Sequence, residues 1–462
     1  MRTITPPAAA TRTGALLITV FVLQFLVALD MSLVNIALPA IRSDLGFTAA
    51  GLSWVVNAYL LCFAGFMLVG GRVGDVWGRR PVILVGLTIF ACASVIGGLA
   101  TAPGLLVGAR AAQGLGAALL APASLALVAT IDDTDRRRKA MGLWGGAGAV
   151  GGAVGVVASG VLTDWWNWRA VMFVNVPIVV IALIATLRGV VSGGRPGARS
   201  RLDVTGGILV TGGVAALVYA VSATGDHGWF SARTVIGTAA AIVLLAAFAV
   251  VERTGSHPLM PIRVLATRSI LGANIFGFML AAGQLAAFYF CSLYIQTVWE
   301  VSADLTGILF LPFCAFVGLG IAVSSKLSAR FGVRNAIVVL GLLGAAGLAV
   351  FARMPEEFDF WTGILLPSLL AATGIGGSMV LVGAAGTAGV AADDVGVASG
   401  VLNSSRQLGR TIGLAVLVTV ATHQSVARDG YQVGLAVGAV FLVVASAAAW
   451  LILPRERRPA HG

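Results

Sequence analysis

Residues 71–80 read Gly-Arg-Val-Gly-Asp-Val-Trp-Gly-Arg-Arg and follow an apolar segment. A second stretch, 254 residues later, reads Ser-Lys-Leu-Ser-Ala-Arg-Phe-Gly-Val-Arg at residues 325–334 and also follows an apolar segment. Both keep the same order of small, basic, aliphatic, aromatic, glycine and basic positions. The repeat predicts that the chain is built from two related halves.

Apolar segments separated by short charged or Pro/Gly-rich breaks fill the sequence on both sides of these stretches. Each is close to the roughly 20 residues that a helix needs to cross a bilayer. Fourteen of them predict an all-α polytopic membrane protein, with spans at about 14–39, 51–71, 81–101, 104–130, 140–162, 170–190, 206–224, 233–251, 269–297, 304–325, 335–353, 360–388, 398–423 and 432–453.

Composition excludes the main alternatives. Of 462 residues, 58% are hydrophobic and 11% are charged, whereas a soluble domain carries roughly 25% charged residues. The mean hydropathy of +0.96 excludes a soluble enzyme, a disordered chain and a lone anchor attached to a large domain. The four cysteines lie in apolar stretches without metal-ligand spacing, and no phosphate-binding loop is present, so we expect no metal, no cofactor and no direct use of ATP.

The distribution of basic residues predicts the topology. With the N-terminus in the cytoplasm, 22 of the 30 lysines and arginines fall at the cytoplasmic ends and five in the opposite loops. This bias predicts a multi-pass protein of the cell membrane, with both termini cytoplasmic and the first span retained. It also explains the net charge of +11 without a nucleic-acid partner.

The halves predict a domain organisation. We expect a six-helix bundle at residues 1–203, two inserted helices and a cytoplasmic linker at 204–268, and a second six-helix bundle at 269–462. Two parallel six-helix halves with a substrate cavity between them form an architecture of alternating-access transporters.

Several motifs make the prediction more specific. Together they resemble the signature set of the 14-span drug:proton antiporter family of the major facilitator superfamily, which implies the major facilitator fold. The motifs are Leu29 to Pro39, residues 71–80, Arg110 to Gly114, Trp168-Arg169, Asn175-Val176-Pro177 and Ser399 to Gly409.

Asp30 is the only acidic residue well inside a predicted span. Such carboxylates are costly in a bilayer and usually mark functional sites, so Asp30 is a candidate for proton or substrate coupling; the alternative is a fixed hydrogen-bond partner that orients its helix. Arg110, with Gln113 one turn later, could exchange partners with Asp30, and the resemblance implies a role in proton transfer. Its alternative is snorkelling to the interface.

The fifth span carries two ladders of small residues, which allow helix backbones to approach closely. The resemblance places an antiporter motif with a Gly-Pro pair here, but this sequence reads Gly155-Val156, so we expect close packing without a proline hinge. The ladders comprise Gly148, Gly152 and Gly160 on one side and Gly151, Gly155 and Ser159 on the other.

The 71–80 stretch is expected to be a cytoplasmic loop with a conformational role, carried by Gly71, Asp75, Gly78, Arg79 and Arg80. Asp75 could cap the next helix or pair with an arginine to hold one conformation closed; the alternative is a solvated loop charge.

Further polar residues inside predicted spans are candidates to line a cavity, although the arginines could also snorkel. Tryptophans near span ends, Trp168 among them, are expected to be interface anchors. The cavity candidates are Gln24, Asn57, Asn274, Gln284, Tyr294, Asn403, Arg406 and Gln407, with Arg410 on the same helix as the last three.

The sequence thus predicts a monomeric secondary transporter, not an enzyme, that exports small amphipathic or cationic drugs or antibiotics in exchange for protons. A metabolite or siderophore exporter, a uniporter, and a non-transporting membrane sensor on the same fold remain alternatives. The expected partners are the lipid bilayer, protons and a small-molecule substrate.

Overall fold

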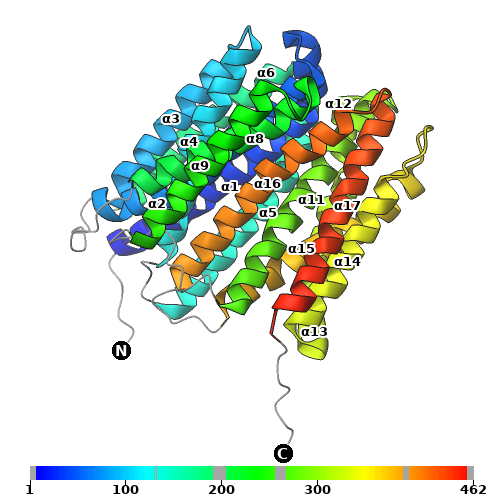
Figure 1. Ribbon diagram of the computed structural model, residues 1–462. Coiled ribbons are helices and arrows are strands. Elements are labelled where there is room, and N and C mark those ends of the chain that lie inside the picture. The colour runs from blue at the N-terminus through cyan, green and yellow to red at the C-terminus, as the bar shows by residue number, and fades with distance from the viewer. Residues whose placement is uncertain are drawn as a thin grey trace, which may run out of the picture. The chain divides into compact units, whose positions relative to one another are not determined.

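The computed structural model describes residues 7–129, 131, 133–190, 204–254, 267–388 and 395–454. In these ranges the regular elements are helices (Figure 1). Eleven helices there are long and apolar enough to cross a membrane, and two shorter apolar stretches cover residues 51–67 and 205–221. With α16 (Val395–Thr422) they match the predicted spans one to one, which confirms the all-α membrane fold.

The chain forms two compact units. The first comprises Met1–Thr211 and Ser302–Ile308, and the second comprises Gly212–Val301 and Leu309–Gly462. The division falls inside α8 (Val204–His227), so the domain boundaries expected at residues 203 and 268 stay predictions.

The first unit has two central helices, which contact each other. Each surrounding helix of the unit packs against at least one of these two. These are α1 (Pro7–Leu45) and α4 (Pro103–Ala129). Side chains on their facing surfaces are therefore buried within the unit. The surrounding helices are α2 (Ala49–Trp77), α3 (Arg79–Gly98), α5 (Thr134–Trp165), α6 (Trp168–Phe173) and α7 (Asn175–Gly189).

The connection between α2 and α3 corrects the loop predicted at 71–80. Residues 71–77 continue α2, and the break is Gly78 alone, with φ 90° and ψ 148°. Gly332 makes the same break, with φ 79° and ψ 156°, between α13 (Leu311–Phe331) and α14 (Val333–Phe351). Only glycine adopts this backbone conformation readily. The sequence repeat is therefore also a repeat of backbone geometry.

In the second unit, α11 (Arg268–Thr297) packs mainly against α15 (Leu366–Thr387), α16 and α17 (Ala427–Ile452). The helix α14 packs against α15 and α17, and α13 packs against α15. The short π-helix η1 (Trp361–Leu365) leads into α15. The helix α12 (Ala303–Leu309) precedes α13 in the chain, but all except its last residue belongs to the first unit. Buried aromatic side chains of α11 and α13 include Phe276, Tyr289, Phe290 and Phe313.

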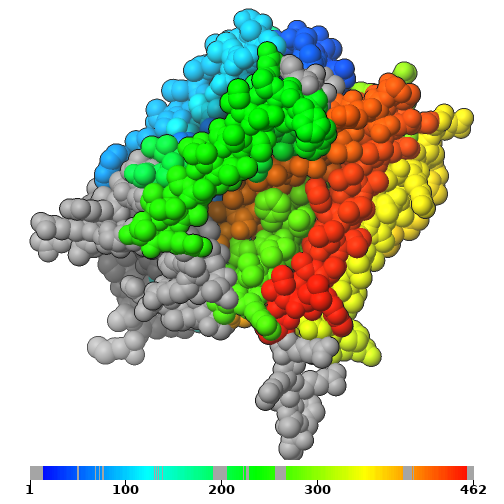
Figure 2. Space-filling model, viewed as in Figure 1, coloured from blue at the N-terminus to red at the C-terminus, as the bar shows by residue number. Residues whose placement is uncertain are grey.

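The helix α9 (Ala232–Thr254) exposes large apolar side chains on the outside of the protein. Its side chains lie on the face of the molecule seen in Figure 2, where α9 is green. Ile236, Ile242 and Val243 are 68%, 64% and 65% exposed. Such a surface suits lipid rather than water.

Candidate functional site

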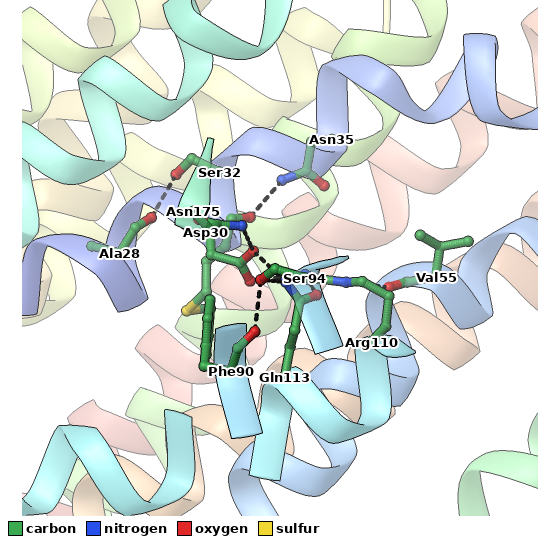
Figure 3. A network of polar contacts seen from close by, with 11 residues as sticks. Ala28, Asp30, Ser32, Asn35, Val55, Phe90, Ser94, Arg110, Gln113 and Asn175 are labelled. Atoms are coloured by element: carbon green, nitrogen blue, oxygen red, sulfur yellow. Dashed lines mark hydrogen bonds and ion pairs between the residues drawn. The ribbon is translucent and has the colours of Figure 1, made fainter. Parts of the chain in front are cut away.

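The carboxylate of Asp30 lies in the middle of α1 and is completely buried. Its Oδ2 accepts a hydrogen bond from Arg110 Nη1 on α4 at 2.8 Å, which also makes an ion pair. Its Oδ1 accepts from Asn175 Nδ2, at the start of α7, at 2.9 Å. Gln113 Nε2 lies 3.5 Å from the same oxygen. Three helices thus meet at one carboxylate (Figure 3).

Arg110 is held on several sides. Its Nη1 also donates to Gln113 Oε1 at 2.7 Å, and its Nε donates to the Val55 carbonyl oxygen of α2 at 3.1 Å. The guanidinium lies 4.4 Å from the centre of the Tyr59 ring. Because the Arg110 side chain is only 2% exposed, the snorkelling alternative is excluded: the charge points into the unit.

The network continues from Gln113 to α3. Gln113 Nε2 donates to Ser94 Oγ at 2.8 Å, and the Ser94 hydroxyl donates to the Phe90 carbonyl oxygen at 2.7 Å (Figure 3). Asn175 and Ser94 are both fully buried. Neither residue was predicted from the sequence as part of the site, although Asn175 belongs to the Asn175-Val176-Pro177 motif. The only sequence signal for them was that each is a polar residue inside a predicted span.

The charges of this site balance while Asp30 is ionised. A buried ion pair is costly to break by removing one partner, because the other charge is then left without compensation. Adding a proton to Asp30 would therefore release Arg110 from its counter-charge. The geometry thus makes Asp30 and Arg110 depend on each other for their charge balance.

The glycine ladders of α5 lie against α1, next to Asp30. A Cβ added at Gly151 would lie 2.7 Å from the carbonyl oxygen of Phe25. A Cβ added at Gly155 would lie 2.6 Å from the carbonyl oxygen of Leu29. The Ser159 hydroxyl donates to the Leu33 carbonyl oxygen. On the other ladder, Cβ positions at Gly148, Gly152 and Gly160 would face Gln24, Ser32 and Ala303, respectively.

At Val156, α5 continues without a break from Thr134 to Trp165. This agrees with the expectation of close packing without a proline hinge. Val156 itself is 2% exposed.

Residues of the 71–80 stretch occupy helix ends. Gly71 faces Pro122 of α4, and Arg80 Nη2 lies 3.4 Å from the Leu187 carbonyl oxygen of α7. Arg79 begins α3. The side chain of Asp75 lies outside the described part of the chain, so its role as a latch stays a prediction.

Trp168 corrects one expectation. It is 2% exposed, and its Nε1 donates to Asp44 Oδ2 at 2.9 Å. Arg169 Nη1 contacts the same oxygen at 2.7 Å. The indole N–H of Trp168 and the guanidinium of Arg169 both bind the carboxylate of Asp44, near the end of α1. This contact holds Trp168 inside the protein, so it is not an interface anchor.

Several of the predicted cavity residues lie where α16 packs against α11. Arg410 on α16 donates from Nη1 to Gln407 Oε1 at 2.5 Å and from Nη2 to Gln284 Oε1 on α11 at 3.2 Å. Ser405 Oγ donates to Asn274 Oδ1 at 2.7 Å. Arg406 and Asn403 are half-buried on α16.

Two other candidates differ from these. The Tyr294 hydroxyl lies 3.0 Å from the carbonyl oxygens of both Met354 and Pro355, so it fastens the loop after α14. Asn57 on α2 is fully buried, and neither atom of its amide has a hydrogen-bond partner in the described structure. Buried polar groups are nearly always hydrogen-bonded, so the role of Asn57 as a cavity residue stays a prediction.

Comparison with known families decides the identity of the fold. The sequence profile of the Major Facilitator Superfamily matches residues 20–414. The chain belongs to the Major Facilitator Superfamily. As a member, it is a multi-pass membrane transporter and not an enzyme.

Individual members of the superfamily are similar over most of the chain. The puromycin resistance protein pur8 of Streptomyces alboniger is 38% identical, over 95% of this chain and 90% of that protein. The cephamycin export protein CmcT of Amycolatopsis lactamdurans is 39% identical, over 86% and 82%. A crystal structure of a POT family transporter in complex with a thioalcohol-conjugated peptide has a TM-score of 0.71 at 14% identity, covering 94% of both chains.

Proposed function

We propose that this Major Facilitator Superfamily transporter exports small amphipathic or cationic drugs or antibiotics in exchange for protons, by alternating access. The observation that carries the proposal is the buried Asp30–Arg110 pair with its shell of Gln113, Asn175 and Ser94. A static scaffold has no need of an ion pair in the middle of a span, where charges are costly.

The functions of the relatives support the direction of transport and the substrate class. One is a puromycin resistance protein and another a cephamycin export protein; a multidrug resistance protein of Mycobacterium tuberculosis is 32% identical over 86% of this chain. Resistance follows when a transporter moves a drug out of the cell. Export against a gradient requires an energy source, and protonation of Asp30 supplies a way to use the proton gradient.

The same proposal covers topology and assembly. The positive-inside bias of the loops supports a position in the cell membrane with both termini cytoplasmic. The groups that hydrogen-bond to Asp30 all come from one chain, which supports a monomer as the functional unit.

The test is drug uptake into inside-out vesicles that contain the full chain. With an imposed gradient, acidic inside, we expect accumulation of puromycin and ethidium that a protonophore abolishes. Uptake that ignores the proton gradient and stops once the drug has equilibrated would indicate a uniporter. A properly inserted chain that moves neither drug would contradict the proposal and favour a sensor or a metabolite or siderophore exporter.

A further inference from the structure

The turn between α13 and α14 carries three positive charges and no negative one. Lys326 and Arg330 lie in the last two turns of α13, and Arg334 lies in the first turn of α14. Only Gly332 separates the two helices, so the charges gather at one end of the helix pair. The stretch from residue 325 to residue 334 contains no aspartate or glutamate.

The matching stretch of the first unit is different. There Asp75 accompanies the arginines, and Arg80 Nη2 lies 3.4 Å from the Leu187 carbonyl oxygen. At the positions 254 residues later, Ala329 takes the place of the acid and Arg334 takes the place of Arg80. The second copy thus keeps cations of the repeat and lacks the carboxylate that could balance them.

The guanidinium of Arg334 packs on an aromatic ring. Its central carbon lies 4.2 Å from the centre of the Trp450 ring, near the end of α17. The Nε atom is buried without a hydrogen-bond partner, and in the described part of the chain no hydrogen bond or ion pair reaches the two Nη groups. The ring covers one face of the guanidinium, so the N–H donors of the Nη groups stay available.

Most acidic residues of the second unit lie at the opposite ends of these helices. Residues 356–359 hold three acids, and they follow the far end of α14, about 28 Å from its start. Glu300 comes just after α11, at the end that binds the same loop. Asp429 lies in the first turn of α17, about 32 Å from Trp450. These carboxylates are too distant to pair with Arg334.

Two further acids belong to the other helices of this unit. Asp226 is near the end of α8, where the Val221 carbonyl oxygen accepts a hydrogen bond from Thr419, close to the end of α16. This end of α16 leads into the start of α17, so Asp226 also belongs to the far end. Glu252 is buried on α9, and no ion pair joins it to Arg334 in the described structure.

Exposed apolar side chains flank the cations. Phe331, Trp450 and Leu451 are all exposed, and the Arg330 guanidinium lies 5.5 Å from the centre of the Phe331 ring. Figure 1 shows the end of α17, in red, next to the turn between α13 and α14. Tryptophan is enriched at the level of the lipid headgroups. This surface therefore offers positive charge and apolar contact at the same end of the membrane spans.

We propose that Lys326, Arg330, Arg334 and Trp450 form a binding site for the headgroup of an anionic phospholipid. The Nη groups of Arg334 donate to the phosphate oxygens, and the Trp450 ring holds the plane of the guanidinium. Lys326 and Arg330 add positive charge, and the exposed apolar side chains beside them contact the acyl chains. The site is separate from the Asp30 network and does not depend on which compound the protein moves.

The test compares two phospholipids that differ only in the headgroup. Native mass spectrometry of the purified full chain measures the binding of dioleoylphosphatidylglycerol and dioleoylphosphatidylcholine as each lipid is titrated. We expect the first phosphatidylglycerol to bind at least about tenfold more tightly than phosphatidylcholine, as for a hydrogen bond between charged groups. Arg334→Gln should remove this preference, and Arg334→Lys should keep part of it because the charge remains.

Arg353→Gln is the matched control. Arg353 is exposed just beyond the other end of α14, so the same change of charge there should leave the preference intact. Equal affinities of the wild-type chain for the two lipids, an unchanged preference in Arg334→Gln, or the same loss in Arg353→Gln would overturn the site.

A second variant and a second anion complete the test. Lys326 and Arg330 are exposed, so the double variant Lys326→Gln with Arg330→Gln should fold normally and lower the preference severalfold; an unchanged preference would contradict their part in the site. An excess of inorganic phosphate should not displace phosphatidylglycerol, because it has no acyl chains. Displacement by phosphate would assign the site to a soluble anion and overturn the lipid.

Discussion

Asn175 donates a hydrogen bond from Nδ2 to Oδ1 of Asp30 at 2.9 Å, while its own Oδ1 is buried without a hydrogen-bond partner in the described structure. The amide is thus placed to sense the carboxylate. With Asp30 ionised, the N–H group donates. With Asp30 protonated, the carboxyl O–H needs an acceptor, and the amide oxygen becomes one if the side chain turns over.

The Asp30–Asn175 bond should be visible in a double-mutant cycle. Asn175→Ala removes a hydrogen bond to a charged group, so we expect a loss of about 1.5–3 kcal/mol in stability. In the Asp30→Asn background the partner is neutral and the loss should fall to about 0.5–1.5 kcal/mol. Thermal unfolding of the four purified chains measures both. An equal loss in the two backgrounds would show that Asn175 matters for packing only.

Arg110→Lys tests whether the geometry of the guanidinium is needed besides its charge. One planar group contacts Asp30, Gln113 and the Val55 carbonyl oxygen at once, and a lysine ammonium cannot span all three. We expect the variant to insert normally and to lose transport roughly tenfold or more, as for the loss of one or two hydrogen bonds. Arg353→Lys should transport normally. Wild-type uptake by Arg110→Lys would reduce Arg110 to a point charge.

Two glycines on α5 form a matched pair. An added Cβ at Gly155 would lie 2.6 Å from the Leu29 backbone oxygen, whereas at Gly152 the nearest atom, Ser32 Oγ, is 3.7 Å away. Gly155→Ala should therefore lower the melting temperature, by overpacking of about 1–3 kcal/mol. Gly152→Ala should leave it unchanged or raise it, because alanine favours the helix. The opposite order in thermal unfolding would contradict the packing of α5 on α1.

The repeated helix break makes a further prediction. Gly78 and Gly332 share a backbone conformation that costs other residues about 1–3 kcal/mol, so Gly78→Ala and Gly332→Ala should each lower the melting temperature by a similar amount. Gly318→Ala is the control, since nothing lies within 4 Å of a Cβ there. Destabilisation by only one of the two substitutions would show that the breaks are not equivalent.

Much of the fold was predictable from the sequence because each span satisfies a local rule. About 20 apolar residues must form a helix in a bilayer, since no water is present to bind the backbone. The helix ends were less predictable. Residues 71–77 contain glycine and charge and suggested a loop, yet α2 continues through them to Trp77, because a helix can extend beyond the apolar core of the membrane.

The site was predictable only in part. Asp30 and Arg110 are charges inside predicted spans, and that alone marks them as functional candidates. Ser94 and Asn175 are ordinary polar residues, and their sequence neighbours do not tell which helices face each other. Their roles follow from the contacts of α3 and α7 with the centre of the unit, which are tertiary facts.

Proton flux through Asp30 is the most direct test of the proposed coupling. Proteoliposomes with an internal pH dye, a proton gradient and puromycin on one side report the proton movement that accompanies drug movement. We expect substrate-dependent flux in the wild type and in Glu357→Gln, a control at an exposed loop acid, and none in a correctly folded Asp30→Asn chain. Wild-type flux in Asp30→Asn would contradict the account, because the carboxylate would then be a structural partner of Arg110 and the proton carrier would lie elsewhere.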